Sequence, residues 1–348
     1  MKAKIRNLAY LLSLTPGLAV ILGNLLGGWY SILNFTYSLV VLGAAEWLLK
    51  PTKQNNNSEK DDTLPLLILY LHLPLQALCI ASYFYGIYSH NLEGTWIWAA
   101  AISMGVNTGS AAIVVAHELI HRKEKHMQFL GRWLLFTAGN FYFFVEHLRV
   151  HHKWVGTSKD AATAKKGQDL YSFFLSSCMG QIKGAWQLES ERLKKAGKPI
   201  WSLNHYVVRQ IVLHLLLDAL IWYTLGYIAL LGFVLHCIVA NFLLEYVNYI
   251  EHYGLSRDEK ERVSELHSWQ SDIPVSRFLL IDLSRHADHH YYASKPYHTL
   301  LSYEKSPELP SGYAGLFFVA AIPPLWFNLM DRRVEGLIDY YSSKDLEF

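Results

Sequence analysis

Nine of the seventeen histidines fall in four short segments, and their spacing is the strongest chemical signal in the chain. In the segment AHELIHR, His117 and His121 stand four residues apart, so a helix would carry both imidazoles on one face. The other segments read EHLRVHH, EYVNYIEHYG and SRHADHH. The candidate ligands that the four segments supply are His117, His121, His147, His151, His152, His252, His286, His289 and His290.

Clustered imidazoles predict a metal site, and their number bears on how many ions it holds. Imidazole suits zinc, copper, iron and nickel. The sequence HELIH also fits a zinc protease in which Glu118 is the general base, but that reading leaves three clusters unexplained. A catalytic zinc takes three protein ligands, whereas nine imidazoles suit two metals with four or five ligands each. Of the candidate metals, iron and copper add redox chemistry that zinc lacks.

Acidic residues accompany the clusters and could orient the ligands. A ligating histidine usually donates its second ring N–H to a carboxylate or a carbonyl. We therefore predict that some of these carboxylates hold ligand rings, although each could instead be an ordinary solvated or capping acid: Glu118, Glu146, Asp160, Glu251 and Asp288. His267, in the segment HSWQS, is a further candidate for contact with a ligand or with an electron donor.

The cysteines limit the kinds of redox centre that the chain could hold. Cys79, Cys178 and Cys237 are far apart, so they form neither a C-x-x-C pair nor a thiolate metal site. A one-electron carrier must then come from another protein. A net charge of +2 gives no reason to expect a nucleic acid partner.

The elements that position these residues are predicted to be membrane helices. The chain is 52% hydrophobic and only 17% charged, against about 25% charged in a typical soluble protein. A spanning helix needs about 20 mostly apolar residues. Six stretches qualify in this sequence: 7–27, 29–49, 64–88, 95–116, 207–226 and 228–248. We expect a single all-α membrane domain over residues 1–348, with six transmembrane helices and a helical cap that holds the histidines.

Lysine and arginine predict the orientation of these helices, because cytoplasmic loops carry the excess of them. The loops after the first, third and fifth stretches contain none, and the other loops contain nearly all. Both termini and every histidine cluster are thus expected in the cytoplasm, with the protein in a bacterial inner membrane. The segments 128–146 and 312–330 are apolar but interrupted, the first at Arg132 and Gly139 and the second at two prolines. We expect both to be interfacial helices under the metal site.

The motifs resemble those of the membrane-bound alkane 1-monooxygenases, within the superfamily of membrane fatty acid desaturases and hydroxylases. HELIHR, EHLRVHH and RHADHH are similar to its three histidine boxes. NYIEHYG with HSWQS resembles a segment that separates alkane hydroxylases from desaturases, and LPSGYAGLFFVAAIPPLWFNLMDRRV resembles its C-terminal stretch. The resemblance covers residues from about 110 to 335.

The resemblance implies a fold and a reaction. It implies a six-helix bundle with cytoplasmic helices, two iron ions held by the nine histidines, and insertion of one oxygen atom of O₂ into a terminal C–H bond of a medium- or long-chain alkane from the bilayer. It also implies electrons from rubredoxin, itself reduced by an NAD(P)H-dependent reductase. Basic residues near the boxes are candidates for docking that donor: Arg122, Lys123, Lys125, Arg149 and Lys153.

Departures from the family pattern affect the substrate more than the metal. Val150 stands where glycine is usual, and LSRHADHHYY and WQSDIPVSR differ from the common forms, yet no ligand is lost. A related hydroxylase or desaturase of fatty acyl, aromatic methyl or terpene substrates therefore stays open. A metal-binding protein or transporter is a further alternative, but its ligands should lie near the bilayer midplane, whereas these lie at the ends of the predicted spans.

Overall fold

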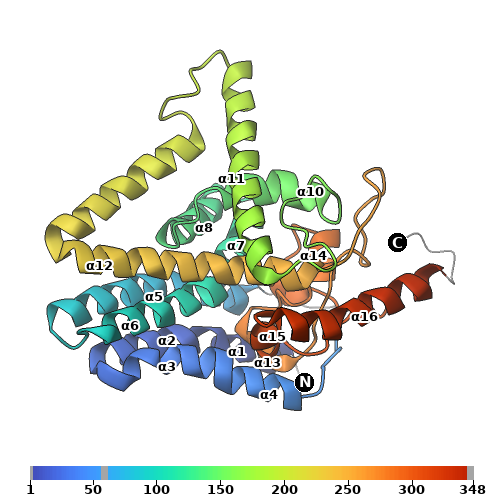
Figure 1. The fold of residues 1–348 in the computed structure, drawn as a ribbon, viewed down its shortest axis with the longest axis horizontal. Helices are drawn as coiled ribbons and strands as arrows, with labels where there is room; N and C mark the ends of the chain where they lie inside the picture. Colours follow the sequence, from blue (N-terminus) through green and yellow to red (C-terminus); the bar gives the residue numbers. More distant parts are fainter. Residues whose placement is uncertain (1–2, 56–61, 343–348) are drawn as a thin grey trace.

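The structure, a computed structural model, describes residues 3–55 and 62–342 as an all-α protein (Figure 1). Apolar helices run side by side, and shorter helices gather at one end of them. The segments of the apolar helices are α1 (Ala3–Ala9), η1 (Tyr10–Leu14), α2 (Thr15–Leu26), η2 (Gly28–Ile32), α3 (Leu33–Phe35), η3 (Thr36–Val41), α4 (Leu42–Leu48), α5 (Thr63–Tyr88), α6 (Thr95–Asn107), η4 (Thr108–Ala112), α7 (Ile113–His121) and α12 (Tyr206–His252).

Within residues 3–55 and 62–342, five continuous apolar helices are long enough to cross a membrane. They run over Arg6–Leu26, Gly28–Leu48, Thr63–Tyr88, Thr95–His121 and Tyr206–His252. The helix Thr95–His121 is the most enclosed of the five, with 83% of its apolar window buried, so it forms the centre of the bundle. These helices contain the predicted apolar stretches, but they differ at the ends: the fourth continues to His121 and the last to His252, which carries both into the histidine clusters.

Helix α12 accounts for two of the predicted stretches. A straight helix of 47 residues would be about 70 Å long, more than twice the roughly 30 Å of a bilayer core. Gly226 interrupts it with a left-handed backbone (φ 85°, ψ 171°), a conformation that costs glycine little. Figure 1 shows the two resulting arms, residues 206–225 and 227–252, diverging from this point. With α12 counted as two arms, the apolar helices match the six predicted spans.

Both predicted interfacial helices are broken in the structure. The first becomes α8 (Lys125–Thr137) and the short α9 (Phe143–Glu146), separated by a turn at Gly139 (φ 66°). The second becomes α15 (Tyr313–Ala320) and α16 (Pro323–Ser342), bent by 119°. The breaks fall at the glycine and the prolines that interrupt the two segments in the sequence, because the glycine reverses the chain in one and the prolines begin a new helix in the other. The interfacial position of these helices stays a prediction.

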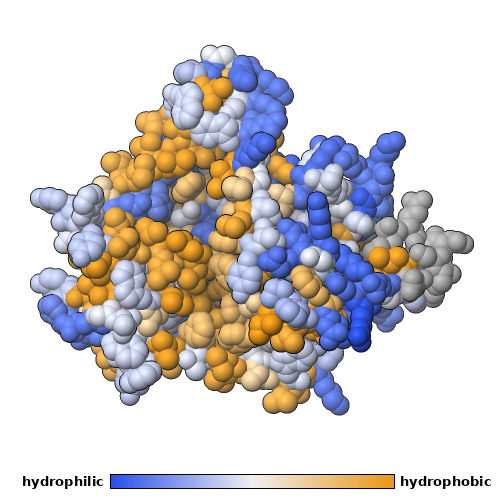
Figure 2. Space-filling model, viewed as in Figure 1, coloured by the Kyte–Doolittle hydropathy of each residue, from blue (hydrophilic) through white to orange (hydrophobic). Residues whose placement is uncertain are grey.

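A long helix that the sequence analysis left out lies across the end of the bundle. Helix α11 (Leu170–Lys195) begins at Asp169, whose carboxylate accepts from the backbone N–H of Tyr171 and Ser172, both at 3.0 Å. It exposes apolar side chains at helical spacing, namely Tyr171, Leu175, Met179 and Ile182. Figure 1 shows it standing crosswise to the spans, and Figure 2 shows hydrophobic residues gathered over the spans. Such a stripe is typical of a helix in the membrane interface.

Candidate metal centre

The nine histidines come together from five elements at one end of the bundle. Helix α7 ends in the first pair, the π-helical turn η5 (His147–His151) and α10 (His152–Trp154) carry the next three, α12 ends at His252, and α14 (His286–Tyr291) carries the last three. Their ring nitrogens form two groups, and within each group the ligand atoms lie within 4.8 Å of one another. The five-histidine group is His117, His121, His147, His152 and His289. The four-histidine group is His151, His252, His286 and His290.

Local helix geometry decides which histidine joins which group. In η5 the backbone follows the i→i+5 pattern, so His147 and His152 share a face and His151 turns to the other group. In α14 the residues His286 and His290 lie one turn apart and join the four-histidine group, while His289 points to the five-histidine group. One segment thus supplies ligands to both groups.

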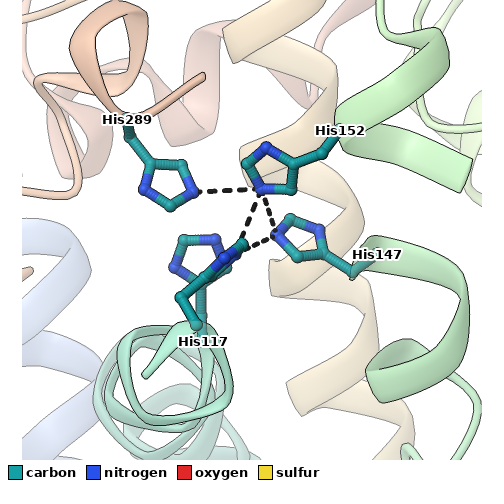
Figure 3. A group of neighbouring side chains, drawn as sticks. His117, His147, His152 and His289 are labelled. Atoms are coloured by element: carbon teal, nitrogen blue, oxygen red, sulfur yellow. Dashed lines mark hydrogen bonds between the residues drawn. The ribbon is translucent and has the colours of Figure 1, made fainter. Parts of the chain in front are cut away.

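The five-histidine group has the nitrogen spacing of a coordination shell. The Nε2 atoms of His121, His147 and His152 lie 3.0 to 3.1 Å apart in all three pairs, and Nε2 of His289 lies 3.2 Å from that of His152. Figure 3 shows the rings of His147, His152 and His289 turned toward one another. Two nitrogens at about 2.1 Å from one ion and at right angles to each other are about 3.0 Å apart. The residues therefore fit a metal ion.

Unpartnered nitrogens support the same conclusion. His117 Nε2, His151 Nε2 and both ring nitrogens of His290 are buried without a hydrogen-bond partner among the described residues, and a buried polar atom without a partner is costly. Burial holds the pKa of His147, His152 and His290 well below its usual range, and the neighbouring imidazoles lower it further. The rings are therefore neutral near pH 7, which is the form that binds a metal.

Two of the five predicted carboxylates contact histidines of the four-histidine group. Asp160 Oδ2 lies 2.9 Å from His151 Nδ1, and Glu251 Oε2 lies 3.1 Å from His286 Nε2. Burial alone would raise the pKa of Asp160, but the pull of His151 outweighs it and the pKa lies below its usual value. The carbonyl of His267 lies 3.3 Å from His252 Nδ1, so this residue meets a candidate ligand through its backbone.

The other three carboxylates have different partners. Glu118 accepts from Arg122 at 2.7 Å and from the Tyr297 N–H at 3.4 Å. Asp288 accepts from Lys295, from the Leu301 N–H and from the Tyr303 hydroxyl, so it anchors the chain after α14. Glu146 Oε2 has no partner among the described residues. For these three the expected role in orienting a ring has no contact behind it, because their oxygens face away from the imidazoles or are taken by other donors.

Histidines inside the spans belong to a separate polar layer. His72 contacts Ser13 at 2.9 Å, and His236 contacts Thr108, in the π-helical turn η4, at 2.8 Å. His214 contacts Asp218 at 3.1 Å. Each ring therefore meets a polar partner, as intramembrane polar side chains generally do, and none joins the two metal groups.

An apolar cavity touches both groups. It has a volume of about 20 Å³, and its lining includes His117 and His147 of one group, His286 of the other, and Glu251. A second cavity of about 40 Å³ lies beside it, and its lining includes Leu39. Gly109 and Val247 line both cavities and so lie between them. These lining residues escaped the sequence analysis, because nothing in their spacing sets them apart from other residues of a buried span.

On the outer side, one surface pocket reaches the metal centre. His290 lines it together with Lys153, Trp154, Arg257 and Arg262. Lys153 Nζ lies 4.6 Å and Lys159 Nζ 4.4 Å from the Trp154 ring centre. Glu259 and Glu261 also line the pocket, so three cations, two carboxylates and aromatic rings lie against a candidate ligand, with a small excess of positive charge.

Comparison with known proteins assigns the chain to a family. The fatty acid desaturase family model matches residues 93–320. Alkane 1-monooxygenase 1 of Pseudomonas aeruginosa is 37% identical over 74% of this chain and 72% of its own length. Alkane 1-monooxygenase 1 of Alcanivorax borkumensis is 32% identical over 93% of this chain and 80% of its own length. The hydroxylase component of xylene/toluene monooxygenase from Pseudomonas putida is 28% identical over 76% of this chain and 72% of its own length. The chain belongs to the alkane 1-monooxygenase family of membrane-bound, desaturase-like oxidoreductases.

Proposed function

We propose that this protein is a di-iron monooxygenase that hydroxylates the terminal carbon of medium- or long-chain alkanes with O₂. The observation that carries the proposal is the meeting of two histidine groups, of five and four members, at the wall of an apolar cavity. Two adjacent groups support two ions rather than one. The relatives named alkane 1-monooxygenase support iron and the alkane class.

The protein's own residues supply binding, orientation and exclusion of water. When bound, the two irons would supply reductive activation of O₂. All nine imidazoles would hold them, and Asp160 would fix the tautomer of His151 by accepting its Nδ1 proton. The cavity of about 20 Å³ has room for a group the size of one water or methyl. Its apolar lining, with Ile113, Leu244 and Val247, favours the methyl end of a chain over water.

Longer substrates require the second cavity. An alkane entering past Leu39 would pass Gly109 and Val247 before its end reaches His117 and His286. The two cavities together are smaller than such a chain, so side chains along the path must change rotamer as it enters. This path runs from between the spans, which fits a substrate dissolved in the bilayer.

The electron donor is proposed to be a rubredoxin, reduced by an NAD(P)H-dependent reductase. The basic pocket at His290 is where an acidic carrier could approach the metals most directly. Of the basic residues predicted to dock the donor, Lys153 lies in this pocket. The positive-inside pattern supports a metal centre and both termini in the cytoplasm of a bacterial cell, with the spans in the inner membrane.

One assay tests the proposal. Purified protein is analysed for iron and then supplied with rubredoxin, reductase, NADH, ¹⁸O₂ and alkanes of graded length. We expect about two irons per chain and a 1-alkanol that carries ¹⁸O. Absence of iron, or an alkene without inserted oxygen, would overturn it. Because the xylene/toluene relative is also similar, xylene is included in parallel, and faster turnover of xylene than of every alkane would reassign the substrate class.

A further inference from the structure

A groove lies between helix α8 and the first arm of α12. It has a volume of about 530 Å³ and is lined by Phe129, Arg132, Trp133, Phe136, Arg209, Gln210, Leu213 and Leu217. Figure 1 shows this arm leaning away from the rest of the bundle, and Figure 2 shows hydrophilic residues between the hydrophobic surfaces of the arm and of the bundle. The groove therefore opens among membrane-spanning surfaces rather than into the metal centre.

Two arginines mark one end of the groove. The guanidinium of Arg132 lies 5.1 Å from the ring centre of Phe144, and that of Arg209 lies 5.7 Å from the ring centre of Tyr206. These two rings are themselves 5.6 Å apart, so one aromatic pair brings both cations together. Each arginine donates to one backbone carbonyl, Arg132 to Gln128 and Arg209 to Leu203. Over residues 3–55 and 62–342, no carboxylate forms a salt bridge with either.

The other end of the groove is apolar. Leu213 and Leu217 follow Arg209 down the arm at helical spacing, and Phe136 lies one turn beyond Arg132 on α8. Leu213 is 46% exposed, and Phe136 and Leu217 are half-buried. Cationic groups at one end and an open apolar surface at the other match a molecule with an anionic head and an aliphatic tail.

We propose that this groove binds an anionic phospholipid, with its phosphate at Arg132 and Arg209 and one acyl chain along Phe136, Leu213 and Leu217. Charge complementarity selects this occupant, because two half-buried guanidiniums without carboxylate partners require negative charge. Arginine binds phosphate with a planar, bidentate geometry, and both cations here have N–H groups left to donate. The lipid would fill the space between the first arm and α8 and hold the arm against the bundle.

The alkane substrate is a less suitable occupant. A hydrocarbon would leave both guanidiniums without a counter-ion, and the groove shares no lining residue with either cavity at the metal centre. The proposal is independent of the reaction, so its test does not depend on turnover.

Lipid retention in native mass spectrometry tests the site. Wild-type protein in mixed detergent micelles is titrated with phosphatidylglycerol or phosphatidylcholine of equal chain length. We expect tighter retention of one phosphatidylglycerol, and a loss of roughly fivefold per arginine, hence roughly 25-fold in R132Q/R209Q. The matched control is K194Q/K195Q, which removes two exposed cations from α11 and should retain the lipid as wild type does. Unchanged iron content in both double variants verifies that they fold.

Three results would overturn the proposal. Equal retention of the two lipids by the wild type would mean that the groove has no headgroup preference. Retention of phosphatidylglycerol by R132Q/R209Q at the wild-type level would remove the two arginines from the site. An equal loss in K194Q/K195Q would reduce the effect to general attraction of basic surfaces, and displacement by alkane regardless of headgroup would assign the groove to hydrocarbon.

Discussion

The five-histidine and four-histidine groups use one kind of side chain but differ in what lies beside the rings. Asp160 contacts His151, the carbonyl of His267 faces His252, and Glu251 contacts His286 in the smaller group. In the larger group the rings contact one another, and Phe143 stacks on His147 at 4.4 Å. Within the described residues, no carboxylate hydrogen-bonds a ring of that group.

The difference suggests two ways of holding a metal. A carboxylate behind an imidazole fixes its orientation and makes it a stronger donor. The four-histidine group has fewer ligands, and Asp160 supports one of them at His151 Nδ1, whereas Glu251 contacts the His286 nitrogen that faces His252. The five-histidine group has more ligands, held by packing alone. The two metals would then differ in how strongly each depends on a single residue, and the following substitutions test this.

The largest effect is expected from removing a ligand of either group. His152→Ala and His290→Ala should each lower hydroxylation by more than about 100-fold, beyond the range usual for residues behind a ligand. Each should also lose about one iron per chain, measured by elemental analysis, because the groups are separate. His126→Ala, an exposed histidine at the start of α8, is the control and should keep both irons. Complete loss of iron from either ligand variant would show that the groups are a single unit.

The supporting carboxylates should have a smaller effect, confined to one group. Asp160→Asn should weaken iron retention in the four-histidine group by about 10- to 100-fold, measured by chelator titration, because an amide oxygen that accepts from His151 Nδ1 carries no negative charge to strengthen the ring as a ligand. Glu118→Gln is the matched control, since Glu118 contacts Arg122 and Tyr297 instead of a ring. If Asp160→Asn and Glu118→Gln weakened iron retention equally, the contact between Asp160 and His151 would not explain how the metal is held.

Some features of this metal centre could be predicted from the sequence and others could not, as particular residues show. The i,i+4 pair His117 and His121 needs only a helix, and all nine candidate ligands lie in the two groups. Their division was beyond prediction, because it depends on the π-helical turn at His147–His151, which no local residue pattern indicates. The sequence also could not distinguish Asp160 from Asp288. Both acids lie near histidines in the chain, but only Asp160 contacts a histidine ring.

The fold shows a similar division between local and tertiary signals. Apolar length predicted the spans, and Gly226 marked the break in α12 because its left-handed backbone suits glycine. Gly139 was identified as an interruption, but the reversal of the chain there was not predicted, since a glycine can also stand within a continuous helix. Helix α11 was missed because its apolar stripe is narrow and its remaining residues are polar.

The cavity between the groups gives a test of chain length. Val247→Phe should narrow the space between the two cavities, and long alkanes should then lose roughly tenfold more kcat/KM than short ones, a difference of about 1.4 kcal/mol. Val234→Phe adds the same bulk to the exposed face of α12 and should leave the length profile unchanged. A uniform loss at all chain lengths in Val247→Phe would mean that the path does not pass this residue.

The smallest effect is expected from substitutions that test which of the two histidine groups faces the electron donor. Lys153 and Arg262 border the pocket at His290 of the four-histidine group, while Lys123 and Lys125 follow His121 of the five-histidine group. Removing exposed charges mainly slows association, so Lys153→Gln/Arg262→Gln should raise the KM for rubredoxin by about 3- to 10-fold and leave kcat unchanged. The effect should shrink as salt rises, because exposed charges are screened. Lys123→Gln/Lys125→Gln removes the same charge and should change the KM for rubredoxin less than twofold. If this control raised KM more than Lys153→Gln/Arg262→Gln did, the donor would bind over the five-histidine group. Electrons would then enter through the metal that lacks carboxylate support.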